Sequence, residues 1–358
     1  MRECVVTNTS CNGTPRDLRE SMVVIKKMTV DNCSFLNELS SKVLRGDAIT
    51  WGEAQGILSL SAQEEVIMLL AHATQIRNHF KGTAIDLCAI VNAKSGRCSE
   101  DCVFCAQSAH YKADIQTYPL LDTNKIIEEA EKAKHNGARQ FSIVISGKSV
   151  TTERELETIC EAIRIISQRL QLIPCASLGI VSSEQLHFLH DAGLTRYHHN
   201  LETAESHFQK VCSTHSFKER IDTIVAAQRE GFEVCAGGIF GIGETPEQRI
   251  ELAFTLRELE VDSIPLNFLH PIQGTPVEKY RLLPPLEILK VIALFRFVHP
   301  LKDIRICGGR EVGLRTLQPL MYLAGASGTM VGNYLTTSGR DPQIDKQEIV
   351  DLGFAVKA

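Results

Sequence analysis

From residue 84 onward, short apolar runs alternate with longer amphipathic segments, and this alternation limits the possible folds more than any other feature. The apolar runs are TAIDLCAIV, RQFSIVIS, IPCASLG, RYHHNL, EVCAGGIFG, SIPLNFL, DIRICGG and GTMVG. Eight strand–helix units, about 30 residues apart, are typical of parallel strands joined by helices. They predict an α/β protein with a (β/α)8 TIM-type barrel, either closed or incompletely closed.

The segments between the runs have the apolar periodicity of helices. Three of them end at Gly137, Gly193 and Gly231, where a glycine is expected just after a helix. The main alternative is a doubly wound open sheet. No dinucleotide-binding glycine motif follows the first strand to support that alternative.

Upstream of the barrel the chain changes character, and we predict three parts. Residues 1–33 form a polar tail that is a candidate for disorder, residues 34–83 form a helical lead-in, and residues 84–358 form the barrel. The tail contains Cys4, Cys11 and Cys33, and Met28 is an alternative start of the chain.

Composition excludes several classes of protein. The chain has 358 residues, 44% of them hydrophobic, with a net charge of −5 and scattered Lys and Arg residues, so we expect neither nucleic-acid nor membrane binding. The apolar run VIMLLAHA is far too short to span a bilayer, and the first residues lack the apolar core of a secretory signal. Twelve cysteines in such a chain indicate reduced thiols in the cytoplasm rather than a disulfide scaffold.

The stretch CSEDCVFC places Cys98, Cys102 and Cys105 within eight residues, directly after the first predicted strand. In a barrel this loop lies on the catalytic face. Three thiolates need a further ligand to complete a zinc site, and a zinc site with a distant ligand is the alternative interpretation. A cubane iron–sulfur cluster held by three cysteines instead leaves one iron open to bind a substrate.

Cysteines also lie in the predicted first, third, fifth and seventh strands, at Cys88, Cys175, Cys235 and Cys307. Alternate strands contribute to the same interior layer of a barrel, so these thiols could converge, although each could also be a small buried hydrophobe. Arg305 shares a strand face with Cys307 and would need an anion beside it. We therefore predict a second iron–sulfur cluster inside the barrel, and we expect Cys160 and Cys212 to be structural.

The C-x3-C-x2-C spacing resembles that of the radical S-adenosylmethionine (SAM) superfamily. This resemblance implies a [4Fe–4S] cluster whose open iron binds SAM, with Phe104 beside the adenine. Further segments together resemble the biotin synthase family, which implies sulfur insertion into dethiobiotin, with sulfur supplied by an auxiliary cluster. These segments are KSGRCSEDCVFCAQSAHYK, HHNLET, FKERIDTI, VCAGGIFGIGET, PLNFL, QGTP and IRICGGRE.

The family resemblance also implies roles for single residues. Cys98, Cys102 and Cys105 match the ligands of the SAM cluster; Cys175, Cys235 and Arg305 match those of the auxiliary cluster; Asn200 and Glu202 match residues that hold the SAM ribose and dethiobiotin; Arg220 matches a residue near the SAM carboxylate; and Asn267 matches a contact to the ureido ring. Alternate spacing should turn His198, Asn200 and Glu202 inward on the fourth strand. The two asparagines could instead cap strand ends, and we expect His198 to line the cavity with its hydrogen bonds satisfied.

Four positions depart from the family pattern, namely Cys88, Ser142, His198 and Cys307, which replace a usual Ser, Cys, Asn and Ser. These changes argue against the usual [2Fe–2S] auxiliary cluster. We predict a 4Fe-type auxiliary cluster ligated by Cys175, Cys235 and Cys307, with Cys88 near or bound, whose free iron carries an extra sulfide.

The resemblance further implies a flavodoxin or ferredoxin as electron donor and a homodimer. Two other functions remain open from the sequence. One is a different radical SAM barrel enzyme, such as a hydrogenase maturase or methylornithine synthase, and the other is a non-enzymatic iron–sulfur redox sensor.

Overall fold

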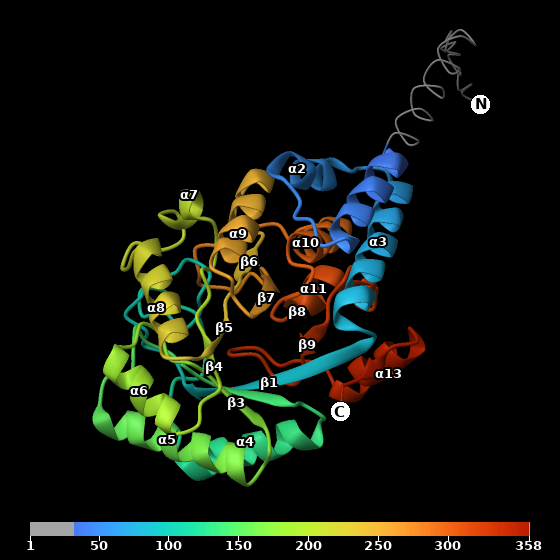
Figure 1. Cartoon of the computed structure of the whole chain (residues 1–358). Coiled ribbons are helices and arrows are strands. Elements are labelled where there is room, and N and C mark those ends of the chain that lie inside the picture. Colours follow the sequence, from blue (N-terminus) through green and yellow to red (C-terminus); the bar gives the residue numbers. More distant parts are fainter. Residues whose placement is uncertain (1–31, 358) are drawn as a thin grey trace, which may run out of the picture.

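Figure 1 shows a computed structural model of the protein, which describes residues 32–357. The chain enters through a helical stretch over residues 32–44, followed by α2 (Trp51–Ser59) and α3 (Gln63–Lys81). The predicted tail therefore lies outside the described residues, except that Asn32 and Cys33 already belong to the first helix. The division of the chain into three parts stays a prediction.

The strands form a closed parallel barrel, so the barrel prediction is confirmed and the open-sheet alternative is wrong. The strands are β1 (Ala84–Lys94), β2 (Gln140–Ile145), β3 (Ile173–Ser177), β4 (Arg196–His198), β5 (Glu233–Cys235), β6 (Gly238–Phe240), β7 (Ser263–Phe268), β8 (Asp303–Ile306) and β9 (Gly328–Met330). Pairing of β9 with β1 closes the ring. Both β5 and β6 pair with β7 and together fill one strand position, while β10 (Ala355–Val356) adds to the start of β1.

Helices surround the barrel (Figure 1). They are α4 (Thr123–His135), α5 (Glu153–Gln168), α6 (Ser183–Asp191), α7 (Glu205–Phe208), α8 (Phe217–Arg229), α9 (Pro246–Glu258), α10 (Pro285–Val298), α11 (Arg310–Leu314), α12 (Leu320–Leu323) and α13 (Pro342–Asp351), with a 3₁₀ turn at Arg315–Leu317. Asp122, Thr152, Ser182, Ser216 and Thr245 cap α4, α5, α6, α8 and α9. Each of these side chains satisfies a free backbone N–H at the start of its helix.

The predicted helix ends are confirmed at Gly137, Gly193 and Gly231, which have φ angles of 84°, 90° and 90°. Only glycine adopts this left-handed conformation without strain.

The helix α10 is buried on every side from Ile288 to Val298. It packs against α2, α3 and α9, so the N-terminal helices cover an outer surface that a plain barrel would expose to water. This packing accounts for the largely apolar sequence of α10, within which the charged side chains of Lys290 and Arg296 are also buried. Among residues 32–357, no helix combines the length and apolarity needed to cross a bilayer.

Candidate functional site

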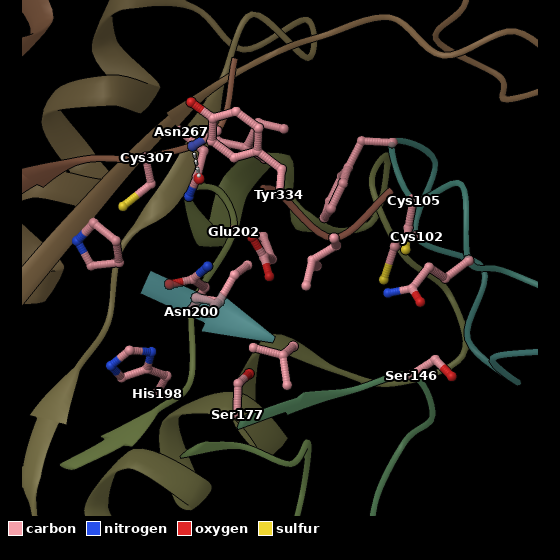
Figure 2. Close-up of a pocket in the computed structure, with 18 of the residues that line it drawn as sticks. Cys102, Cys105, Ser146, Ser177, His198, Asn200, Glu202, Asn267, Cys307 and Tyr334 are labelled. Carbon is pink, nitrogen blue, oxygen red and sulfur yellow. Dashed lines mark hydrogen bonds between the residues drawn. The ribbon is translucent and has the colours of Figure 1, made fainter. Parts of the chain in front are cut away.

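A cavity of about 420 Å³ lies at the C-terminal ends of the strands (Figure 2). Its wall combines the loops after the strands with inward-facing strand residues, as in other parallel barrels. The predicted site residues in this wall are Cys88, Cys98, Cys102, Phe104, Cys105, Asn200, Glu202, Arg220, Cys235, Asn267, Arg305 and Cys307. Within the described chain, Cys175 is the predicted site residue that the wall does not include.

The three-cysteine loop after β1 is a compact turn. The backbone N–H of Cys98 donates to Gln107 at 2.9 Å, and that of Cys105 donates to Cys102 at 2.9 Å. Figure 2 shows the sulfur atoms of Cys102 and Cys105 directed into the same part of the cavity. Burial raises the pKa of Cys105 to about 11, so this thiol keeps its proton at neutral pH unless a metal ion displaces it.

Phe104 places an apolar surface beside the three thiols. It is half-buried and packs against an apolar group of side chains, namely Val211, Ile242, Leu269 and Val277. An aromatic face in this position can stack on a flat heterocycle. The structure therefore brings together the thiols and the aromatic ring that the sequence placed in one loop.

Arg220 organises the polar side of the cavity. Its Nη1 donates to the carbonyl of Asn200 at 2.8 Å and lies 3.7 Å from the carboxylate of Glu202. Burial raises the pKa of Glu202, although the Arg220 charge opposes this shift. An arginine and a partly compensated carboxylate can together bind a ligand that carries both a carboxylate and hydroxyl groups.

The prediction that His198, Asn200 and Glu202 share one continuous strand is wrong. The strand β4 ends at His198, and Glu202 has a φ of 68°, in the left-handed region. The three side chains nevertheless line the same cavity, because Glu202 forms an isolated bridge to Gly238 that holds the chain beside the barrel.

Sequence reasoning missed a buried polar group beside the three-cysteine loop. Cys212, expected to be merely structural, has its donor atom within 4.8 Å of those of Cys102 and His215. However, His215 Nε2 accepts from Arg220 Nε at 3.0 Å, so its Nδ1 carries the proton and donates to Glu100. A protonated Nδ1 is not a metal ligand, so the three residues do not form a metal site of their own, and Cys212 and His215 instead position the loop beside Cys102. No sequence spacing relates residues 102 and 212.

Arg305 lies in the floor of the cavity. Its Nη2 donates to Asp86 at 2.8 Å and its Nε donates to Ser263 at 3.1 Å, while its buried Nη1 has no hydrogen-bond partner among the described residues. Asp86 therefore supplies part of the negative charge that the sequence predicted beside this arginine. Asp86 could have been found from the sequence, because it is two residues before Cys88 and shares its strand face.

The thiols of Cys88 and Cys307 meet directly above this floor. The neighbouring Cys307 thiol, together with the charge of Arg305, lowers the pKa of Cys88, whereas the pKa of Cys307 is raised by Cys88 and by burial. Cys235 lines the same cavity, while the thiol of Cys175 lies 3.7 Å from the carbonyl of Ile173. Three of the four strand cysteines therefore converge in the cavity wall.

Two further predicted contacts have mixed outcomes. Asn267 accepts from the N–H of Gly308 at 2.9 Å and donates to the carbonyl of Gly238 at 3.3 Å, so it joins loop ends as the capping alternative proposed. The expectation that His198 is fully satisfied is wrong. Its Nδ1 lies 3.3 Å from Ser142 Oγ, but its buried Nε2 has no partner in the described part of the chain. Two positions that depart from the family pattern are thus hydrogen-bond partners.

The donor set fits iron–sulfur clusters at both ends of the cavity. One end has the three thiols of the loop, and the other has Cys88, Cys235 and Cys307 beside the unpaired Nη1 of Arg305. Thiolates are the usual ligands of such clusters, and an unpaired guanidinium N–H suits their sulfide anions.

Comparison with solved structures shows the fold alone. The methylornithine synthase PylB superposes with a TM-score of 0.79 at 21% identity, covering 89% of this chain and 97% of the other. The [FeFe]-hydrogenase maturase HydG superposes with a TM-score of 0.77 at 16% identity, covering 95% of this chain and 78% of the other.

Sequence comparison separates this chain from those two enzymes. The radical SAM superfamily model matches residues 93–256, and that of the biotin and thiamin synthesis associated domain matches residues 265–355. Biotin synthase of Geobacter sulfurreducens is 49% identical over 324 residues, covering 90% of this chain and 98% of the relative. Biotin synthase of Pelobacter propionicus is 49% identical over 329 residues, with the same coverage. The chain therefore belongs to the biotin synthase family, radical SAM sulfurtransferases that use a [4Fe–4S] cluster, SAM and an auxiliary iron–sulfur cluster to insert sulfur into dethiobiotin.

Proposed function

We propose that Cys98, Cys102 and Cys105 hold the SAM-cleaving cluster and that the second group of thiols holds the sulfur donor. The observation that carries this proposal is the position of both thiol groups in the wall of one cavity. Three cysteine ligands leave one iron open to the amino and carboxylate groups of SAM. Dethiobiotin would then lie between the radical source and the sulfur store.

The polar residues of the cavity would orient the two substrates. Arg220 is the candidate partner of the SAM carboxylate, and Phe104 packs beside the adenine. Glu202 and Asn200 are within reach of the ribose and of dethiobiotin, since both line the wall. Asn267 would contact the ureido ring, whose N–H and C=O groups match an amide side chain.

For the auxiliary cluster we favour a 4Fe type with an extra sulfide over a [2Fe–2S] type. The ligands would be Cys175, Cys235 and Cys307, with Cys88 near or bound. The cavity wall includes Cys88 but not Cys175 within the described chain, which supports Cys88 as the alternative third ligand. Comparing the Cys88→Ala and Cys175→Ala proteins separates the two sets, because only the loss of a true ligand lowers the auxiliary iron content.

Three further expectations follow from the family resemblance. Flavodoxin or ferredoxin would supply the electron, the chain would form a homodimer, and it would act in the cytoplasm. Light scattering on the anaerobically purified protein tests the dimer, and reduction by each purified donor tests the first expectation.

The decisive experiment is anaerobic reconstitution followed by iron and sulfide counting and Mössbauer spectroscopy. Two 4Fe-type clusters give about eight irons per chain. Cys98→Ala should lose the SAM cluster and the formation of 5′-deoxyadenosine, while Cys235→Ala should keep both but form no biotin. Cys160→Ala, far from either group, is the matched control. Zinc at the loop would overturn the whole proposal, and a [2Fe–2S] spectrum would overturn the auxiliary cluster type.

A further inference from the structure

His198 ends β4 and faces the interior of the barrel beside the strand cysteines. It pairs in register with Cys235 on β5, and both residues line the cavity with Cys88 and Cys307. Its Nε2 is buried without a hydrogen-bond partner among residues 32–357. Leaving a buried polar group unpaired is unfavourable, so this nitrogen points to an interaction with a bound group.

The hydrogen bond to Ser142 fixes which ring nitrogen carries the hydrogen. Ser142 is 2% exposed, and within the described chain its hydroxyl has one partner, His198 Nδ1, at 3.3 Å. A buried hydroxyl hydrogen needs an acceptor, so Ser142 donates and Nδ1 accepts. The ring hydrogen of His198 is therefore on Nε2, which makes Nε2 an unsatisfied donor rather than a free metal ligand.

In this part of the cavity, sulfur is the candidate hydrogen-bond acceptor for His198 Nε2. Cys235 is the register partner of His198, and the thiols of Cys88 and Cys307 line the same cavity. The negative sulfur atoms of an iron–sulfur cluster accept N–H hydrogen bonds, and such bonds raise the reduction potential of the cluster.

We propose that His198 donates its Nε2 hydrogen to a sulfur atom of the auxiliary cluster, and that Ser142 holds the ring in the required tautomer. This inference rests on the proposed function, since it requires an auxiliary cluster beside these thiols. His198 is then a positioning residue that stabilises the reduced cluster, and it does not replace a cysteine ligand.

The test compares His198→Phe, which has no donor, with His198→Gln, whose amide can donate from a similar place. The exposed His187 provides a matched control, His187→Phe. Each protein is labelled with ¹⁵N-histidine, reconstituted and reduced, and both the hyperfine spectrum and the potential of the auxiliary cluster are measured.

We expect a weak ¹⁵N coupling in the wild type and in His187→Phe that is lost in His198→Phe. We also expect a lower cluster potential in His198→Phe, restored in part by His198→Gln. Ser142→Ala should weaken the coupling. Without the hydroxyl that donates to Nδ1, the ring hydrogen of His198 would be distributed between Nδ1 and Nε2. These readouts do not depend on turnover.

Two results would overturn the inference. One is an unchanged coupling and potential in a His198→Phe protein that retains its iron, and the other is a strong ¹⁵N coupling, which indicates ligation of iron. Wild-type protein that binds only the SAM cluster would instead refute the proposed function, so the two failures are distinguishable by iron content.

Discussion

The guanidinium of Arg305 and the carboxylate of Asp86 form an ion pair in the floor of the cavity, with 2.8 Å between Nη2 and Oδ2. Asp86 also accepts from Gln140 at 2.9 Å, and Gln140 accepts from Arg196. This network joins β1, β2, β4 and β8. The floor of the cavity is therefore held together by ion pairs and hydrogen bonds between buried polar side chains rather than by apolar packing.

Asp86→Asn should destabilise the protein by about 3–5 kcal/mol, because it removes the main counter-charge of a buried arginine. Anaerobic denaturant unfolding measures the change. Asp191→Asn, on an exposed residue whose one ion-pair partner within residues 32–357 is His187, should shift the free energy of unfolding by less than about 0.5 kcal/mol. Equal effects of the two substitutions would show that the floor network adds nothing to stability.

Asn267→Asp should raise the KM for dethiobiotin about tenfold, since losing the amide donor removes about 1.4 kcal/mol of binding. The aspartate keeps the acceptor that holds Gly308 but cannot donate to the carbonyl of Gly238, whereas Asn267→Ala loses both contacts, so the free energy of unfolding of each variant is measured beside its KM. Steady-state assays at varied dethiobiotin check this. An unchanged KM in Asn267→Asp would leave Asn267 with the capping role alone.

Cys102→Ala and Cys212→Ala should behave differently although the two thiols are neighbours. Cys102→Ala should lose the SAM cluster and all 5′-deoxyadenosine formation. Cys212→Ala should keep the full iron content, because His215 beside it is protonated on Nδ1 and Cys212 makes only hydrogen bonds. Loss of iron from Cys212→Ala would show that this thiol is a ligand.

The helix α8, which carries Arg220, should lose part of its stability in acid. Hydrogen bonds from the Ser216 backbone, Lys148 and the Ser216 hydroxyl lower the pKa of Glu219 to about 2. A lowered folded-state pKa means that the contribution is complete above about pH 4.5 and is lost as the pH falls toward 2.

Because the Glu219 side chain is 41% exposed to solvent, we expect this contribution to be less than about 1 kcal/mol. Unfolding of cluster-free protein between pH 6 and 3 measures it without interference from cluster breakdown. Glu219→Gln should unfold with a flatter pH dependence than the wild type. Parallel curves for the two proteins would contradict the capping contribution.

Local patterns determined the barrel and one half of the site. Strand and helix periodicities are set by each residue's neighbours, so the eight strands and the main helices could be predicted from the sequence. The cysteine loop could also be predicted from the sequence, because Cys98, Cys102 and Cys105 are close in the chain and need only a tight turn to meet.

Only the tertiary structure decided which distant residues meet. Asp86 pairs with Arg305, Cys88 with Cys307, Cys102 with Cys212 and Ser142 with His198. These pairs depend on the stagger between strands and on the closure of β9 against β1, and no local spacing specifies either. The chain beyond β4 also escaped prediction, because the left-handed φ of Glu202 is imposed by its bridge to Gly238 and not by its own preference.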